Sequence, residues 1–171
     1  MIDYSKIKYI VLDVDGTLTD GGIIYDSLGN ELKRFDAKDG LGIKVAIAAG
    51  LIIVIITGRE SLMVKRRASE LGVQHLLSGI QLKLPKLLEW MDEYNAIFEE
   101  ICYIGDDLND LQCMQSVGLC MCPADASSEI TNISHYISDK KGGHGAVRDC
   151  IETILRGQKK WETAYEQLYC C

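Results

Sequence analysis

The sequence lacks features that would indicate whole classes of protein. Its most apolar stretch, residues 45–57, is too short to cross a bilayer, and residues 1–10 lack the basic start and long apolar segment of a secretory signal. Positive charge is also scarce, because 18 lysines and arginines stand against 25 aspartates and glutamates, a net charge of -7. We therefore expect a cytoplasmic protein that binds neither membranes nor nucleic acids, and that meets any phosphate-bearing ligand with a local positive group or a metal ion.

Proline is rare, with two residues in 171, while hydrophobic residues make up 47% of the chain, as in an ordinary soluble globular protein. The length fits a single domain over residues 1–171. The seven cysteines lack zinc-like spacing, because neither Cys120-x-Cys122 nor Cys170-Cys171 has a second ligand pair. We expect buried thiols in a reducing compartment instead.

Short apolar runs alternate with helical patterns along the chain. We expect strands at residues 8–13, 51–57, 73–77, 101–106 and 118–121, and helices at 40–49, 61–71, 82–94, 108–116 and, as one or two segments, 145–169. This alternation indicates an α/β fold with a doubly wound, Rossmann-like parallel sheet, which binds ligands beyond the carboxyl ends of its strands. Residues 22–36 predict an inserted β-hairpin that packs against the domain or a neighbouring subunit.

Acidic side chains stand where two of the expected strands end. Asp13 and Asp15 come at the end of the first strand, and Asp106, Asp107 and Asp110 follow the fourth. If the first strand lies between the second and the fourth, these groups converge on one crevice. Three or more carboxylates do not remain ionised together without a cation, and a set of oxygen ligands favours Mg²⁺. The sequence therefore predicts a magnesium site there.

Asp13 and Asp15 can divide the work of a phosphoryl transfer. Asp13 is placed as a nucleophile that forms an aspartyl-phosphate. Asp15 can protonate the leaving oxygen and then deprotonate the water that hydrolyses the acyl-phosphate. At the end of the second strand, Thr57 offers a hydroxyl to a phosphate oxygen, and a lysine from the helix after the third strand can add positive charge.

Four short motifs resemble the signature motifs of the haloacid dehalogenase-like superfamily of phosphotransferases: DVDGT at 13–17, TG at 57–58, a downstream lysine, and GDDLND at 105–110. The resemblance covers nearly the whole chain. It implies that Asp13 is the nucleophile and Asp15 the acid/base residue. By the same resemblance, Thr57 and Lys83 bind the phosphate, and Asp106 is a further metal ligand. In the same motifs Gly58 adjoins the phosphate, the backbone carbonyl of Asp15 joins Asp13 and Asp106 as a metal ligand, and Asp107 and Asp110 are supporting acids.

The gaps between these motifs leave no room for the cap domain that most members of the superfamily carry. The chain resembles a capless branch whose members hydrolyse 3-deoxy-D-manno-octulosonate 8-phosphate in lipopolysaccharide biosynthesis, and whose relatives act on nine-carbon, sialic-acid-like 9-phosphates. The branch implies a homotetramer joined through the hairpins, with a neighbouring subunit closing the site. Residues 142–145 resemble its glycine-rich flap.

A sugar-acid phosphate carries a carboxylate, so a second cationic contact is expected. Arg59, Arg66 and Arg67 are candidates, and the resemblance favours Arg59, with Arg67 second. Pro85 leaves Lys86 open as an alternative to Lys83 if the helix begins at the proline.

Two other classes of function fit parts of the pattern. A phospho-accepting signalling domain also places an acidic pocket, a threonine and a lysine on a parallel sheet, but carries no acid two residues after the phosphorylated aspartate. A non-catalytic assembly module is a further interpretation, because phosphatase-like domains of this branch also occur fused to sialic-acid-activating enzymes. Since every motif residue is present here, we predict an enzyme.

Overall fold

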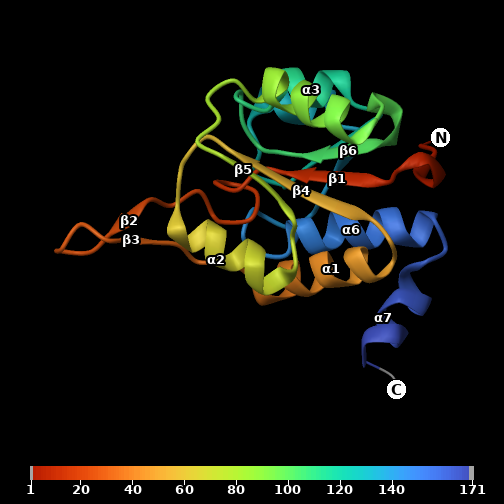
Figure 1. The fold of residues 1–171 in the computed structure, drawn as a ribbon, viewed down its shortest axis with the longest axis horizontal. Coiled ribbons are helices and arrows are strands. Elements are labelled where there is room, and N and C mark those ends of the chain that lie inside the picture. Colours follow the sequence, from red (N-terminus) through yellow and green to blue (C-terminus); the bar gives the residue numbers. More distant parts are fainter. Residues whose placement is uncertain (1, 170–171) are drawn as a thin grey trace.

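A computed structural model describes residues 2–169 (Figure 1). Its centre is a parallel sheet of six strands in the order β5-β4-β1-β6-β7-β8. The strands are β1 (Tyr9–Leu12), β4 (Ile52–Thr57), β5 (His75–Ser78), β6 (Ile101–Ile104), β7 (Leu119–Cys122) and β8 (Tyr136–Ile137). The expected α/β fold is thereby confirmed. Cys170 and Cys171 lie outside the described residues.

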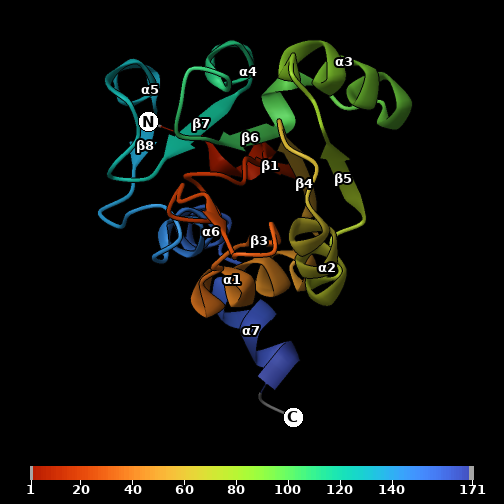
Figure 2. The same ribbon diagram turned by 90° about the vertical axis from the view of Figure 1, so that its left-hand side faces the viewer.

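Helices cover both faces of the sheet (Figure 2). One face carries α1 (Ala37–Ala48), α2 (Leu62–Leu71), α6 (Ala146–Gly157) and α7 (Trp161–Tyr169), and the other carries α3 (Lys83–Tyr94), α4 (Leu111–Ser116) and α5 (Ser128–Ile133). Short 3-10 helices span Tyr4–Lys6 and Phe98–Glu100. Two separate apolar clusters form because alternate residues of each buried strand face opposite helical layers.

The strand register decides which side chains meet. β1 lies between β4 and β6, and Leu12 is paired with Ile55 on one side and Ile104 on the other. The residues that follow β1 and β6 therefore leave the sheet at the same edge. This arrangement confirms the strand order on which the predicted convergence of acids depends.

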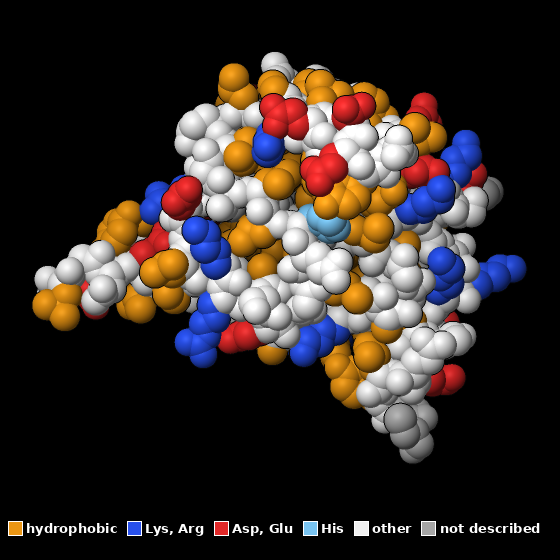
Figure 3. Space-filling model, viewed as in Figure 1, with side chains coloured by type: hydrophobic (Ala, Val, Ile, Leu, Met, Phe, Trp, Pro, Cys, Tyr) orange, Lys and Arg blue, Asp and Glu red, His pale blue; other side chains and the backbone are white. Residues whose placement is uncertain are grey.

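The hairpin predicted at 22–36 is present between β1 and α1. Its two strands, β2 (Ile24–Tyr25) and β3 (Glu31–Leu32), are antiparallel, and the hairpin projects away from the body of the molecule (Figure 1). Hydrophobic side chains lie along this projection (Figure 3). They are Ile23, Ile24, Tyr25, Leu28 and Leu32, each at least half exposed.

The predicted strands and helices all occur, with ends shifted by a few residues, while the short β8 and α5 were not predicted. Five cysteines are buried free thiols, as expected: Cys102, Cys113, Cys120, Cys122 and Cys150. Among residues 2–169, no helix has both the length and the apolar character needed to span a bilayer. The cytoplasmic location stays a prediction.

Candidate active site

Three carboxylates meet beyond the central strands. Asp13 follows β1, and Asp106 and Asp110 lie in the loop between β6 and α4; one oxygen of each lies within 4.8 Å of the others. Asp13 is 3% exposed and Asp110 is fully buried. The parallel register brings these acids together, as the sequence predicted. Asp110, predicted as a supporting acid, lies inside the cluster.

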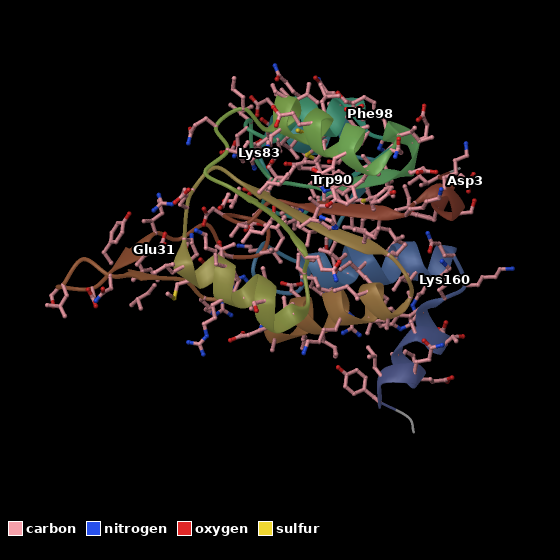
Figure 4. The ribbon with its side chains drawn as sticks, viewed as in Figure 1. Asp3, Glu31, Lys83, Trp90, Phe98 and Lys160 are labelled. Atoms are coloured by element: carbon pink, nitrogen blue, oxygen red, sulfur yellow. The ribbon has the colours of Figure 1, made fainter. Side chains whose placement is uncertain are left out.

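Lys83 joins the cluster from the first turn of α3, and Figure 4 shows it at that end of the helix. Its Nζ donates to Asp13 Oδ1 at 2.5 Å and to Asp110 Oδ1 at 2.7 Å. Lys86 instead pairs with Glu89 on the surface. The helix begins at Lys83 and contains Pro85 in its first turn, where proline is tolerated. The structure therefore brings Lys83, and not Lys86, to the acids.

The electrostatics of the cluster favour a bound cation. Burial, followed by repulsion from Asp110, raises the pKa of Asp13 well above its ordinary value. Burial also raises the pKa of Asp106 to about 6. Three ionised carboxylates and one ammonium leave two negative charges. These oxygen donors therefore fit a hard divalent cation in both charge and chemistry.

The loop after β1 allows Asp106 to approach closely. Gly16 has φ +99°, and a Cβ placed there would lie 2.0 Å from Asp106 Oδ2. The Thr17 hydroxyl donates to Asp106 Oδ1 at 2.9 Å. Glycine is therefore needed at position 16 for both its backbone conformation and its lack of a side chain.

Asp15 is not one of the three clustered acids. Its carboxylate forms an ion pair with Lys33, a residue that follows the hairpin strand β3. The side chain of Lys33 is 2% exposed. The two acids of the motif thus have different partners, Lys83 for Asp13 and Lys33 for Asp15.

The end of β4 supplies a polar group and a cation. Thr57 is buried, and its Oγ accepts the Arg59 backbone N–H at 3.4 Å. Arg59 reaches the hairpin, where its Nη2 donates to Tyr25 Oη at 3.0 Å and to Glu31 Oε1 at 3.2 Å. Gly58 lies between Thr57 and Arg59 and is partly buried.

The other predicted residues are not part of the acid cluster. Arg66 is exposed and pairs with Glu70. Arg67 packs over the ring of Phe35 and donates to the Asp36 carbonyl at 3.4 Å. Asp107 is exposed, and its carboxylate accepts the N–H of the next residue.

The glycine-rich residues 142–145 pack on the loop after β1. The Gly143 N–H donates to the Thr17 carbonyl at 3.1 Å, and a Cβ at Gly142 would lie 1.7 Å from the Gly16 carbonyl oxygen. Buried Asp39 of α1 fixes the far end of the segment by accepting the Gly145 N–H at 3.2 Å. The segment therefore lies beside the candidate site, as its resemblance to a flap implied.

Lys33, Glu31 and Asp39 were not identified from the sequence. Glu31 and Lys33 are separated by one residue, so on a strand they face the same side, and this spacing in the hairpin was a usable signal. Asp39 carries no such signal, because an acid near the start of a helix is commonplace.

A family model described as haloacid dehalogenase-like hydrolase matches residues 82–150. The chain is 39% identical over 160 residues to the 3-deoxy-D-manno-octulosonate 8-phosphate phosphatase of Yersinia pestis, covering 94% of this chain and 86% of the relative.

Solved structures show the same likeness. The crystal structure of the corresponding phosphatase from Moraxella catarrhalis, in complex with a magnesium ion, a phosphate ion and KDO, is similar with a TM-score of 0.93 and 39% identity, covering 97% of this chain and 95% of that one. The cobalt-bound phosphatase from Haemophilus influenzae has a TM-score of 0.90 and 32% identity, over 95% and 98% of the two chains. The chain is therefore a phosphoric monoester hydrolase of the haloacid dehalogenase-like superfamily, and belongs to its capless family of 3-deoxy-D-manno-octulosonate 8-phosphate phosphatases.

Proposed function

We propose that this protein is a Mg²⁺-dependent phosphatase that hydrolyses 3-deoxy-D-manno-octulosonate 8-phosphate through an aspartyl-phosphate on Asp13. The buried Asp13 carboxylate carries the proposal, because it lies at the carboxyl end of the central strand between a lysine and two further acids. Membership of the phosphatase family and a relative solved with magnesium, phosphate and KDO support the substrate and the metal.

In this proposal, one oxygen of Asp13 attacks phosphorus while the bond to the sugar oxygen breaks, and Asp15 gives that oxygen a proton. Asp15 then takes a proton from water, which attacks the acyl-phosphate, releases inorganic phosphate and restores Asp13. Thr57 and Lys83 hold the phosphoryl oxygens. When bound by Asp13, the Asp15 carbonyl and Asp106, Mg²⁺ neutralises the crowded acids and lowers the repulsion between nucleophile and substrate.

Arg59 is the group that we assign to the substrate carboxylate, with Arg67 second. Arg59 directly follows the phosphate-binding Thr57-Gly58 pair, and its guanidinium donates to Tyr25 and Glu31 of the hairpin. Arg67 lies against Phe35 and the start of α1. A guanidinium suits this role because its planar donors match a carboxylate.

Phosphate release from a panel of phosphorylated sugar acids tests the proposal. The panel contains the octulosonate 8-phosphate, a nine-carbon sialic-acid-like 9-phosphate and p-nitrophenyl phosphate, each assayed with Mg²⁺ and with excess chelator. We expect the highest kcat/KM for the octulosonate ester and loss of turnover with chelator. A higher kcat/KM for the nine-carbon ester would reassign the substrate, and an absence of metal-dependent release from all three would overturn the function.

We also propose a homotetramer in which the hairpins associate. The apolar side chains on the projecting hairpin support this assembly, because an isolated two-stranded hairpin is marginally stable in water.

A further inference from the structure

Strand β3 and the residue after it carry charged side chains that pair with residues of the candidate site. Glu31 and Lys33 lie on the same side of the chain, while Leu32 between them is 50% exposed on the other side. Figure 4 shows Glu31 on the hairpin, away from its tip. On β3, the exposed Leu32 thus lies on the face opposite the charged pair.

Lys33 has the more deeply buried side chain of the two. Its side chain is 2% exposed and pairs with the Asp15 carboxylate and, at 3.6 Å, with Glu31 Oε1. A lysine is seldom buried to this extent, because removing an ammonium from water is costly unless negative partners hold it. This ion pair therefore ties the chain that follows β3 to the loop that follows β1.

Glu31 connects Lys33 to the arginine that follows β4. Glu31 Oε1 accepts from Arg59 Nη2 at 3.2 Å, and Tyr25 Oη accepts from the same nitrogen at 3.0 Å. Within the described residues, Arg59 Nε is buried and has no hydrogen-bond partner. The hairpin therefore orients the guanidinium, and one of its donors, Nε, is left unpaired.

Asp15, Lys33, Glu31 and Arg59 form a row of alternating charge. The row runs from the loop after β1, through the hairpin, to the loop after β4. Its formal charges sum to zero, so it fixes four ionic groups without adding net charge to the candidate site. Its two ends are the acid/base residue and the carboxylate-binding residue of the proposed function.

We propose that Lys33 and Glu31 are positioning residues, through which the hairpin fixes the Asp15 carboxylate relative to the leaving oxygen and the Arg59 guanidinium relative to the substrate carboxylate. This inference rests on the proposed function. The hairpin then sets, within one subunit, the span between the ester oxygen and the acid group of a substrate. Lys33 influences the hydrolysis of every ester, because each hydrolysis needs Asp15. Glu31 influences mainly esters that carry a carboxylate, because it works through Arg59.

Steady-state kinetics of matched variants test the role of Lys33. Lys33→Met removes the ammonium and keeps most of the stem, Lys33→Arg keeps the charge, and Lys44→Met on the exposed side of α1 is the control. With Mg²⁺ present, we expect Lys33→Met to lower kcat at least about tenfold for both the octulosonate ester and p-nitrophenyl phosphate, with a smaller change in KM. Lys33→Arg recovers part of kcat, and the control behaves like the unchanged protein.

Glu31→Gln supplies an independent measurement, since it keeps the shape of the side chain and removes its charge. We expect the ratio of KM for the octulosonate ester to KM for p-nitrophenyl phosphate to rise at least about threefold, because Arg59 loses its ionic partner. All assays are run at a temperature well below the thermal unfolding midpoint of each variant, so that unfolding is not mistaken for a loss of function.

Any of three results would overturn the positioning role. They are a kcat for Lys33→Met within about twofold of the unchanged protein, a kcat for Lys33→Arg as low as that for Lys33→Met, and an unaltered KM ratio in Glu31→Gln. The proposed function fails differently, through lack of metal-dependent turnover in the unchanged protein. If that protein hydrolyses p-nitrophenyl phosphate and not the octulosonate ester, the assigned substrate is wrong, and the Lys33 arm still decides whether the hairpin positions Asp15.

Discussion

The acid cluster with Lys83, which we call the floor of the candidate site, differs from the hairpin beside it in burial. The side chains of the floor are buried or partly buried and are paired, whereas those of the outer hairpin are exposed. On the floor, Asp13, Lys83 and Asp110 are each at most 3% exposed, and hydrogen bonds within one chain join them. On the hairpin, Leu28 is 85% exposed and Ile24 is 50% exposed. The comparison shows that a single chain can build the proposed reacting groups, whereas the outer hairpin presents a surface that association would cover.

The strongest test of the floor removes its proposed nucleophile. Asp13→Asn keeps the side-chain volume and a hydrogen-bond acceptor for Lys83, but the amide does not form an acyl-phosphate. We expect kcat to fall on the order of 10⁴-fold or more while the fold is kept. Phosphate release and circular dichroism check both parts. Near-normal turnover by this variant would exclude Asp13 as the nucleophile.

The close approach of Asp106 to Gly16 predicts a large effect when Gly16 is replaced. In Gly16→Ala, the new Cβ would meet Asp106 at 2.0 Å, and the backbone would keep a strained φ of +99°. We expect a loss of stability of about 1–3 kcal/mol from the backbone alone and, because Asp106 is displaced, a fall in kcat/KM of about 100-fold.

Gly50→Ala is the matched control for this clash. Gly50 has φ +85°, but a Cβ there meets nothing within 4 Å. It should show the loss of stability without the loss of activity. Equal kinetics in the two variants, measured beside their urea unfolding curves, would refute the idea that position 16 is constrained by Asp106.

The buried carboxylate of Asp39, outside the floor, predicts a smaller, pH-dependent effect on stability. Burial raises the pKa of Asp39 to about 6 from an ordinary 3.8, although the Arg148 and Gly145 N–H groups lower it. Because the folded protein favours the protonated form, the stabilising contribution of Asp39 is full below pH 3.8 and is lost as the pH rises through about 6. At neutral pH the ionised carboxylate costs up to about 3 kcal/mol.

Asp39→Asn should remove this cost and keep an acceptor for the backbone N–H groups. We expect its free energy of unfolding, relative to the unchanged protein, to increase between pH 4 and pH 7. Urea unfolding across this range measures the trend, and the exposed Asp139→Asn serves as control. A difference that is the same at every pH would show that the titration of Asp39 is not linked to folding.

The smallest expected effect on the folded subunit comes from the outer hairpin. Replacing Ile24 and Leu32 by serine leaves the floor untouched but removes two exposed apolar side chains. We expect light scattering to show smaller assemblies than the homotetramer proposed for the unchanged protein, with little change in secondary structure. Ile97→Ser, at a similarly exposed position before β6, is the control. A monomeric unchanged protein at micromolar concentration would contradict the assembly.

The sequence predicted that the acids of the floor converge, but it did not predict the contacts that the hairpin residues make with the site. Asp13 and Asp106 follow apolar strands, and a parallel sheet brings such strand ends to one edge, so local pattern and topology suffice. The choice between Lys83 and Lys86 needed the observed start of α3. The contact of Lys33 with Asp15 depends on the path by which the chain returns from the hairpin to the loop after β1, and no short sequence motif indicates that path. β8 and α5 were missed because two and six residues give too little periodicity.

Chemical trapping of the acyl-phosphate tests the central proposal most directly. Borohydride added during turnover of the octulosonate ester with Mg²⁺ reduces an aspartyl-phosphate to homoserine, and peptide mass spectrometry locates the modified residue. We predict modification at Asp13, dependent on both ester and metal, and none at Asp15, Asp106 or Asp110. Rapid turnover with no modification at Asp13, or with modification at another carboxylate, would contradict the proposal that Asp13 receives the phosphoryl group.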